Sequence, residues 1–130
     1  MHKPCPYILL LLLLWLSPAA LAHDPPKPPG VIHVVMVWLK EPGNPAHRQQ
    51  IISGSKKLEA IPGVQEIRVG EVVESEREVV DDSFDVALYM RFASEEAMQT
   101  YLAHPDHVNA VKEYFLPIMD RYRVYDFRDE

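Results

Sequence analysis

Hydrophobic and polar residues follow two periods along this chain, and together they predict four strands and two helical regions. Continuous apolar runs or period-two alternation predict strands at residues 31–39, 64–73, 84–92 and 122–127. Apolar residues at helical spacing predict a helix at residues 46–61 and a second helical region at residues 94–118. The resulting β-α-β-β-α-β order predicts a ferredoxin-like α+β fold.

The second helical region is interrupted by Pro105. Proline lacks an N–H, and its ring would clash with the carbonyl four residues back, that of Tyr101. It also disfavours helical angles at His104, and it is favoured at the first position of a helix. We therefore predict one helix ending near Ala103 and another starting at Pro105, with His104 as a candidate cap for the second. Such a bend lets Tyr101 and His107 converge on one cavity.

The predicted sheet has one face without a cover, because two helices protect only the other face. The uncovered face carries apolar and aromatic side chains: Val34, Met36, Trp38, Tyr89 and Tyr125. An apolar surface of this kind indicates an interaction site. Two copies packed sheet to sheet would bury it, so the sequence predicts a homodimer.

The first 22 residues have the three-part pattern of a secretory signal peptide. Lys3 gives a positive start, residues 7–16 form an apolar run, and Ala20-Leu21-Ala22 places small residues at a cleavage position. The apolar run is shorter than the roughly 20 residues that a membrane-spanning helix needs. We predict cleavage after Ala22 and a periplasmic or secreted mature protein that is not bound to a membrane.

The mature chain is predicted to be one small acidic domain, residues 31–130, behind a proline-rich linker at residues 23–30. Without Lys3, the 13 Lys and Arg of the whole chain fall to 12, against 19 Asp and Glu, so the net charge is −7. This charge argues against nucleic acid or an anionic membrane as a partner. The single cysteine, Cys5, lies in the signal peptide, so the domain depends on apolar burial rather than disulfides.

Seven segments of the chain form a recognisable series: His33–Val37, Ile61–Val64, Val69–Gly70, Phe84–Asp85, Met90–Phe92, Tyr101–His107 and Val124–Phe127. Taken in this order, they resemble the stress-responsive A/B barrel (Dabb) family, including its olivetolic acid cyclase-type members. The resemblance implies a dimeric α/β barrel in which two sheets pack together. From the cyclase-type members it implies an intramolecular aldol condensation, with functional positions that correspond to His33, Tyr101, His107 and Asp126.

These side chains suit cofactor-independent acid–base chemistry on a small carbonyl or aromatic compound. An aldol-type cyclisation needs a base for a C–H beside a carbonyl and a donor for the developing oxyanion. The positive end of its helix would keep His107 neutral as the base, and Tyr101 would be the donor. We expect Asp126 to accept the other N–H of His107 and fix its tautomer.

Two other interpretations use the same residues. A non-catalytic stress-response protein would bind a small ligand with these polar groups in an apolar pocket, without turnover. Alternatively, His33, His107 and Asp126 match the residue types of a two-histidine, one-carboxylate metal site, although this needs three separate elements to converge. The favoured function needs no metal and no cofactor.

Overall fold

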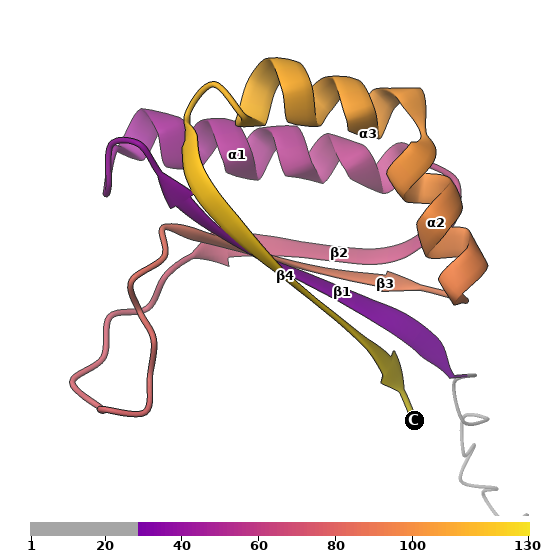
Figure 1. Cartoon of the computed structure of the whole chain (residues 1–130), viewed down its shortest axis with the longest axis horizontal. Helices are drawn as coiled ribbons and strands as arrows, with labels where there is room; N and C mark the ends of the chain where they lie inside the picture. Colours follow the sequence, from indigo (N-terminus) through magenta and orange to yellow (C-terminus); the bar gives the residue numbers. More distant parts are fainter. Residues whose placement is uncertain (1–28) are drawn as a thin grey trace, which may run out of the picture.

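The computed structural model describes residues 29–130, which form a four-stranded antiparallel sheet with all helices on one face (Figure 1). The elements in chain order are β1 (Gly30–Leu39), α1 (Pro45–Lys57), the 3-10 turn η1 (Leu58–Ala60), β2 (Val64–Glu71), β3 (Val86–Phe92), α2 (Glu95–Ala103), α3 (Pro105–Ala110), the π-helical turn η2 (Val111–Phe115) and β4 (Met119–Asp129). This confirms the ferredoxin-like βαββαβ prediction. The predicted signal peptide and most of the linker lie outside the described residues.

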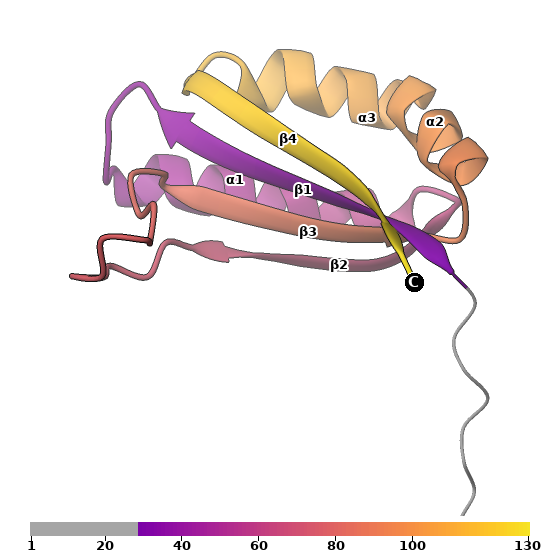
Figure 2. The same cartoon turned by 60° about the horizontal axis from the view of Figure 1, so that its bottom comes forward.

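The strands lie in the order β2-β3-β1-β4, which Figure 2 shows from bottom to top with the helices behind them. β1 is a central strand, paired antiparallel with both β3 and β4. Its register places His33 opposite Met90 on one side and opposite Asp126 on the other. No helix of residues 29–130 is long and apolar enough to cross a membrane.

The start of helix α1 is held in place by two side chains, those of Asn44 and Asp85. Asn44 caps the helix by accepting hydrogen bonds from the backbone N–H groups of the first turn. The buried carboxylate of Asp85 accepts from the backbone N–H of Leu39 at 3.0 Å, from that of Gly43, and from Arg48 at 3.2 Å. This network ties the end of β1 to α1 and so sets the position of the helix over the sheet.

The predicted break at Pro105 is confirmed. α2 begins after Ser94, whose hydroxyl accepts from the backbone N–H of Ala97 at 3.1 Å, and it ends at Ala103. α3 begins at Pro105, and Nδ1 of His104 accepts from the backbone N–H of Asp106 at 3.2 Å. His104 is therefore the cap of α3, in agreement with the structural role predicted for it.

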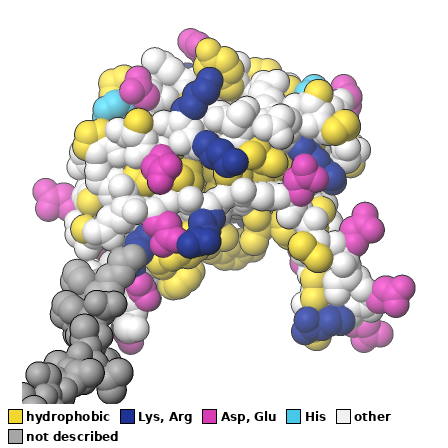
Figure 3. Space-filling model, turned by 180° about the vertical axis from the view of Figure 1, so that it is seen from behind, with side chains coloured by type: hydrophobic (Ala, Val, Ile, Leu, Met, Phe, Trp, Pro, Cys, Tyr) yellow, Lys and Arg dark blue, Asp and Glu magenta, His cyan; other side chains and the backbone are white. Residues whose placement is uncertain are grey.

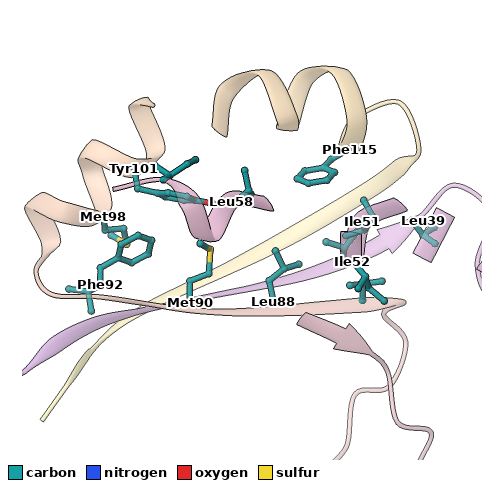
Figure 4. Close-up of a cluster of buried hydrophobic side chains, with 14 residues drawn as sticks. Leu39, Ile51, Ile52, Leu58, Leu88, Met90, Phe92, Met98, Tyr101 and Phe115 are labelled. Carbon is teal, nitrogen blue, oxygen red and sulfur yellow. The ribbon is translucent and has the colours of Figure 1, made fainter. Parts of the chain in front are cut away.

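The core lies between the sheet and the helices (Figure 4). Its most deeply buried members come from β1, α1, β3 and α2, and include Val37, Ile51, Val86, Met90, Phe92 and Tyr101. Figure 4 shows Leu58 beside Tyr101, and Ile51 farther along α1 towards Leu39.

The opposite face of the sheet is open, as the sequence predicts. Tyr125 and Phe127 of β4 are exposed there, and Val34 and Met36 of β1 are only half-buried. Figure 3 shows hydrophobic side chains gathered along the lower surface of the molecule, beside the projecting loop formed by residues 72–85. An apolar sheet face of this kind indicates a protein partner.

Candidate functional site

A cavity of about 210 Å³ lies between the helix-facing side of the sheet and the helices. Its lining residues are His33, Val35, Val37, Ile51, Ser55, Leu58, Leu88, Met90, Tyr101, Leu102, His107, Val111, Phe115, Met119, Tyr122 and Val124. None of them is Asp, Glu, Lys or Arg, so the cavity favours an uncharged occupant. Two of its three β4 residues, Tyr122 and Val124, are exposed, whereas its β3 and α1 residues are buried, so the cavity opens beside β4.

Tyr101 and His107 meet in this cavity across the bend at Pro105. Their ring centroids are 4.6 Å apart, and Tyr101 also packs on Phe92 at 5.0 Å. The predicted convergence of Tyr101 and His107 is therefore confirmed. Tyr101 is only 2% exposed, and this burial raises the pKa of its hydroxyl well above the usual value. The phenol thus stays protonated and available as a hydrogen-bond donor.

His107 is held as a neutral base by its surroundings. Its Nδ1 donates to the backbone carbonyl of Leu102 at 3.0 Å, which places the proton on Nδ1 and leaves the lone pair on Nε2. Burial lowers the pKa of His107, and the nearby His33 lowers it further, while the bond to Leu102 acts in the opposite direction. The positive helix end, expected to keep His107 neutral, is not the main cause of its lowered pKa, because the largest cause is desolvation by burial.

Asp126 does not orient His107, and that expectation is wrong. The carboxylate of Asp126 accepts from Nδ1 of His33 at 2.6 Å, because the β1–β4 register places these residues directly opposite each other. The Leu102 carbonyl fills the role that was predicted for Asp126. His33 is buried and lines the cavity, whereas the Asp126 side chain is 43% exposed and is not a lining residue. Asp126 therefore positions His33, whose Nε2 remains for a bound molecule.

The three-ligand metal set does not assemble. Within residues 29–130, no group of three or more His, Cys, Asp or Glu side chains is placed to hold a metal ion. Asp126 pairs with His33, while His107 is bonded to a backbone carbonyl. The four predicted site residues thus divide into a Tyr101–His107 pair and a His33–Asp126 pair.

Sequence analysis did not identify Ser55 as a site residue. Ser55 lines the cavity from α1, is 0% exposed, and has no hydrogen-bond partner for its hydroxyl among the described residues. The available signal was spacing, because Ile51, Ser55 and Leu58 follow the i, i+4, i+7 pattern of an inward helix face. A serine within such an apolar stripe is a candidate for a polar group in a cavity wall.

Comparisons with known proteins identify the family. The model of the Stress responsive A/B Barrel Domain matches residues 31–129. A segment of 45 residues is 44% identical to a stress-response A/B barrel domain-containing protein of Arabidopsis thaliana, but it covers 35% of this chain and only 17% of that relative.

Two solved structures show the same fold. Hydroxynitrile lyase from Passiflora edulis superposes with a TM-score of 0.69 at 23% identity, over 80% of this chain and 96% of the lyase. A dimeric ferredoxin-like protein of unknown function from Thermobifida fusca superposes with a TM-score of 0.62 at 22% identity, over 78% of this chain and 92% of that one. At these identities the likeness establishes the fold.

Proposed function

This chain belongs to the stress-responsive A/B barrel domain (Dabb) family, and from that premise we propose that its cavity binds a small uncharged carbonyl compound and moves a proton beside the carbonyl group without a cofactor. One observation carries the proposal: a neutral histidine base and a protonated tyrosine lie ring against ring, 4.6 Å apart, in a cavity that no Asp, Glu, Lys or Arg side chain lines. These are the two groups that enolate chemistry requires.

The proposed step uses Nε2 of His107 and the hydroxyl of Tyr101. Nε2 takes a proton from the carbon next to the carbonyl, and the C–H electron pair moves into an enolate. The enolate oxygen accepts a hydrogen bond from Tyr101. If the same carbon takes a proton back, the net result is exchange with solvent. If the enolate carbon attacks a second carbonyl in the same molecule, a C–C bond forms, and the new alkoxide takes the proton from His107.

Similarity in fold supports lyase- or cyclase-type chemistry as the reaction class, since a hydroxynitrile lyase is built on the same fold. His33, which Asp126 orients, would contact the bound molecule on the β1 side of the cavity. Its contribution is to place the carbonyl compound against the Tyr101–His107 pair, where correct orientation lowers the barrier.

Acetophenone is a suitable test compound because it is small, uncharged and carries exchangeable C–H groups beside its carbonyl. We expect the protein to accelerate loss of the methyl signal in deuterated water, measured by proton NMR. His107→Ala should reduce exchange to the rate without protein. His104→Ala is the matched control, because it removes a nearby imidazole that caps α3 and does not line the cavity. A His107→Ala variant that exchanges as fast as wild type would show that the base is assigned wrongly.

The second candidate function is binding without turnover in a stress response. The same groups orient a ligand equally well, and a dimeric neighbour with this fold has no assigned function. If acetophenone binds to the wild type, as detected by chemical-shift changes, but no exchange accompanies binding, this second function is correct and the catalytic one is wrong.

We also propose that the protein acts as a homodimer that buries the open sheet face. Dimeric proteins with this fold support that assembly. Tyr125 and Phe127 are 57% and 53% exposed on this face, and an exposed apolar face marks a protein interaction site.

Export is a separate proposal, and it rests on the pattern of residues 1–22. Amino-terminal sequencing of the protein recovered from the periplasm or medium should begin at His23. Recovery of the uncleaved chain in the membrane fraction would contradict it.

A further inference from the structure

Ser55 lies on the inward face of α1 with its hydroxyl buried and unpaired. The residue is 0% exposed, it lines the cavity, and its Oγ has no hydrogen-bond partner among residues 29–130. Buried polar side-chain atoms are normally paired, so an unpaired one in a cavity wall calls for a partner. A molecule bound in the cavity would lie beside Ser55 and could provide this hydrogen-bond partner.

Two other hydroxyl side chains within helices, those of Ser53 and Thr100, hydrogen-bond to the backbone of the preceding turn, whereas Ser55 does not. Ser53, two residues earlier on α1, donates to the backbone carbonyl of Gln49 at 2.7 Å. Thr100 on α2 donates to the carbonyl of Glu96 at 3.0 Å. Such bonds to the preceding turn are the usual outlet for a hydroxyl inside a helix. Since Ser55 forms no such bond, its hydroxyl remains free for a molecule in the cavity.

We propose that Ser55 is a specificity-determining residue, which hydrogen-bonds a hydroxyl or carbonyl oxygen at a second position on the bound molecule. This inference rests on the proposed function, in which Tyr101 and His107 hold the reacting carbonyl. Along the chain, Ser55 of α1 falls between Leu58 of η1, which lies beside Tyr101, and Ile51 of α1, which lies farther away (Figure 4). A ligand with two oxygen-bearing positions therefore spans the cavity from α2 and α3 to α1.

The cavity also limits the class of this ligand. Its volume of about 210 Å³ is below the roughly 300–1,000 Å³ of sites for drug-sized compounds. Since no Lys or Arg lines the cavity to pair with an anion, the second oxygen belongs to an uncharged hydroxyl or carbonyl group rather than a carboxylate or phosphate. Small one-ring ketones that carry a hydroxyl group fit this description.

The test compares matched ligands in matched variants. The ligands are acetophenone, the three hydroxyacetophenones, and the three methylacetophenones substituted at the same positions. The proteins are wild type, Ser55→Ala and the control Ser53→Ala, and affinity is measured by calorimetric or NMR titration. We expect Ser55→Ala to weaken at least one hydroxyacetophenone by about five- to tenfold, which is the loss of one hydrogen bond. The methyl compounds and the Ser53→Ala protein should show no such change.

A second measurement needs no ligand. Because the Ser55 hydroxyl has no hydrogen-bond partner among residues 29–130, Ser55→Ala should melt at the same temperature as wild type or higher. Ser53→Ala corrects for the helix preference of alanine. A marked fall in the melting temperature of Ser55→Ala alone would reveal a structural partner and overturn the proposal.

The ligand results separate this inference from the proposed function. If acetophenone binds to wild type and no hydroxyacetophenone depends on Ser55, the role of Ser55 is wrong and the carbonyl site stands. If none of the seven compounds binds to wild type at millimolar concentration, the proposed carbonyl site is wrong and the Ser55 assignment falls with it.

Discussion

Replacing Tyr101 by phenylalanine removes one hydroxyl and preserves the ring. That ring is 2% exposed and packs between Phe92, at 5.0 Å, and His107, at 4.6 Å. The hydroxyl has no hydrogen bond to another described residue, so its removal leaves no group newly unpaired. We therefore expect the free energy of unfolding to change by less than about 1 kcal/mol, because the packing surface is retained.

The effect on function should be much larger. If Tyr101 donates to the enolate oxygen, its loss removes one oxyanion donor, which costs a factor of about 10²–10³ in rate, or about 2.7–4 kcal/mol of transition-state stabilisation. The assay combines a thermal melt with acetophenone exchange followed by NMR. Tyr122→Phe is the matched control, since Tyr122 also lines the cavity but is exposed at its mouth. Its exchange rate should change little.

The opposite pattern would refute this reasoning. If Tyr101→Phe melts far below wild type while exchange continues at the wild-type rate, the hydroxyl has a structural partner and no role in the reaction. Equal losses of exchange in Tyr101→Phe and Tyr122→Phe would show that the rate depends on ligand entry rather than on an oxyanion donor.

Three further predictions concern pH, assembly and packing. Because burial lowers the pKa of His107 below its ordinary value of 6.5, the exchange rate measured against pH should rise to a plateau with a midpoint below 6.5. As the pH falls, the histidine of the unfolded chain takes up its proton before that of the folded protein, so the free energy of unfolding should fall below about pH 6.5. Melts at several pH values, with His107→Ala as the reference, test this second effect. Tyr125→Glu should yield a monomer in light scattering. The control Tyr114→Glu changes an equally exposed side chain (57%) on the helical side, so it should remain dimeric. A dimeric Tyr125→Glu protein would contradict a dimer formed through the open sheet face. Gly54→Ala places a Cβ 2.7 Å from the Phe115 ring, so denaturant unfolding should show a net loss of about 1–2 kcal/mol despite the better helix preference of alanine; an unchanged or higher stability would mean that the ring moves aside freely.

The sequence by itself determined the fold and the bend beneath the site. Period-two and helical spacing are local properties of apolar side chains, so they predicted the four strands and the helices from neighbouring residues alone. Pro105 acts on its own turn through a missing N–H and a steric clash, so the end of α2 at Ala103 and the cap at His104 were equally local. That bend allowed Tyr101 and His107 to converge, and the tertiary structure shows that they do.

The tertiary structure decided which groups face one another. Asp126 pairs with His33 because the β1–β4 register sets cross-strand neighbours, and register depends on contacts 93 residues apart in the chain. The neutral state of His107 comes from burial by several elements rather than from its own helix end. The Ser55 hydroxyl, which has no partner among residues 29–130, lines a cavity that α1, the sheet and η2 form together. Spacing places a side chain on a face, but the partners and the solvent that it meets there are fixed by packing between distant segments.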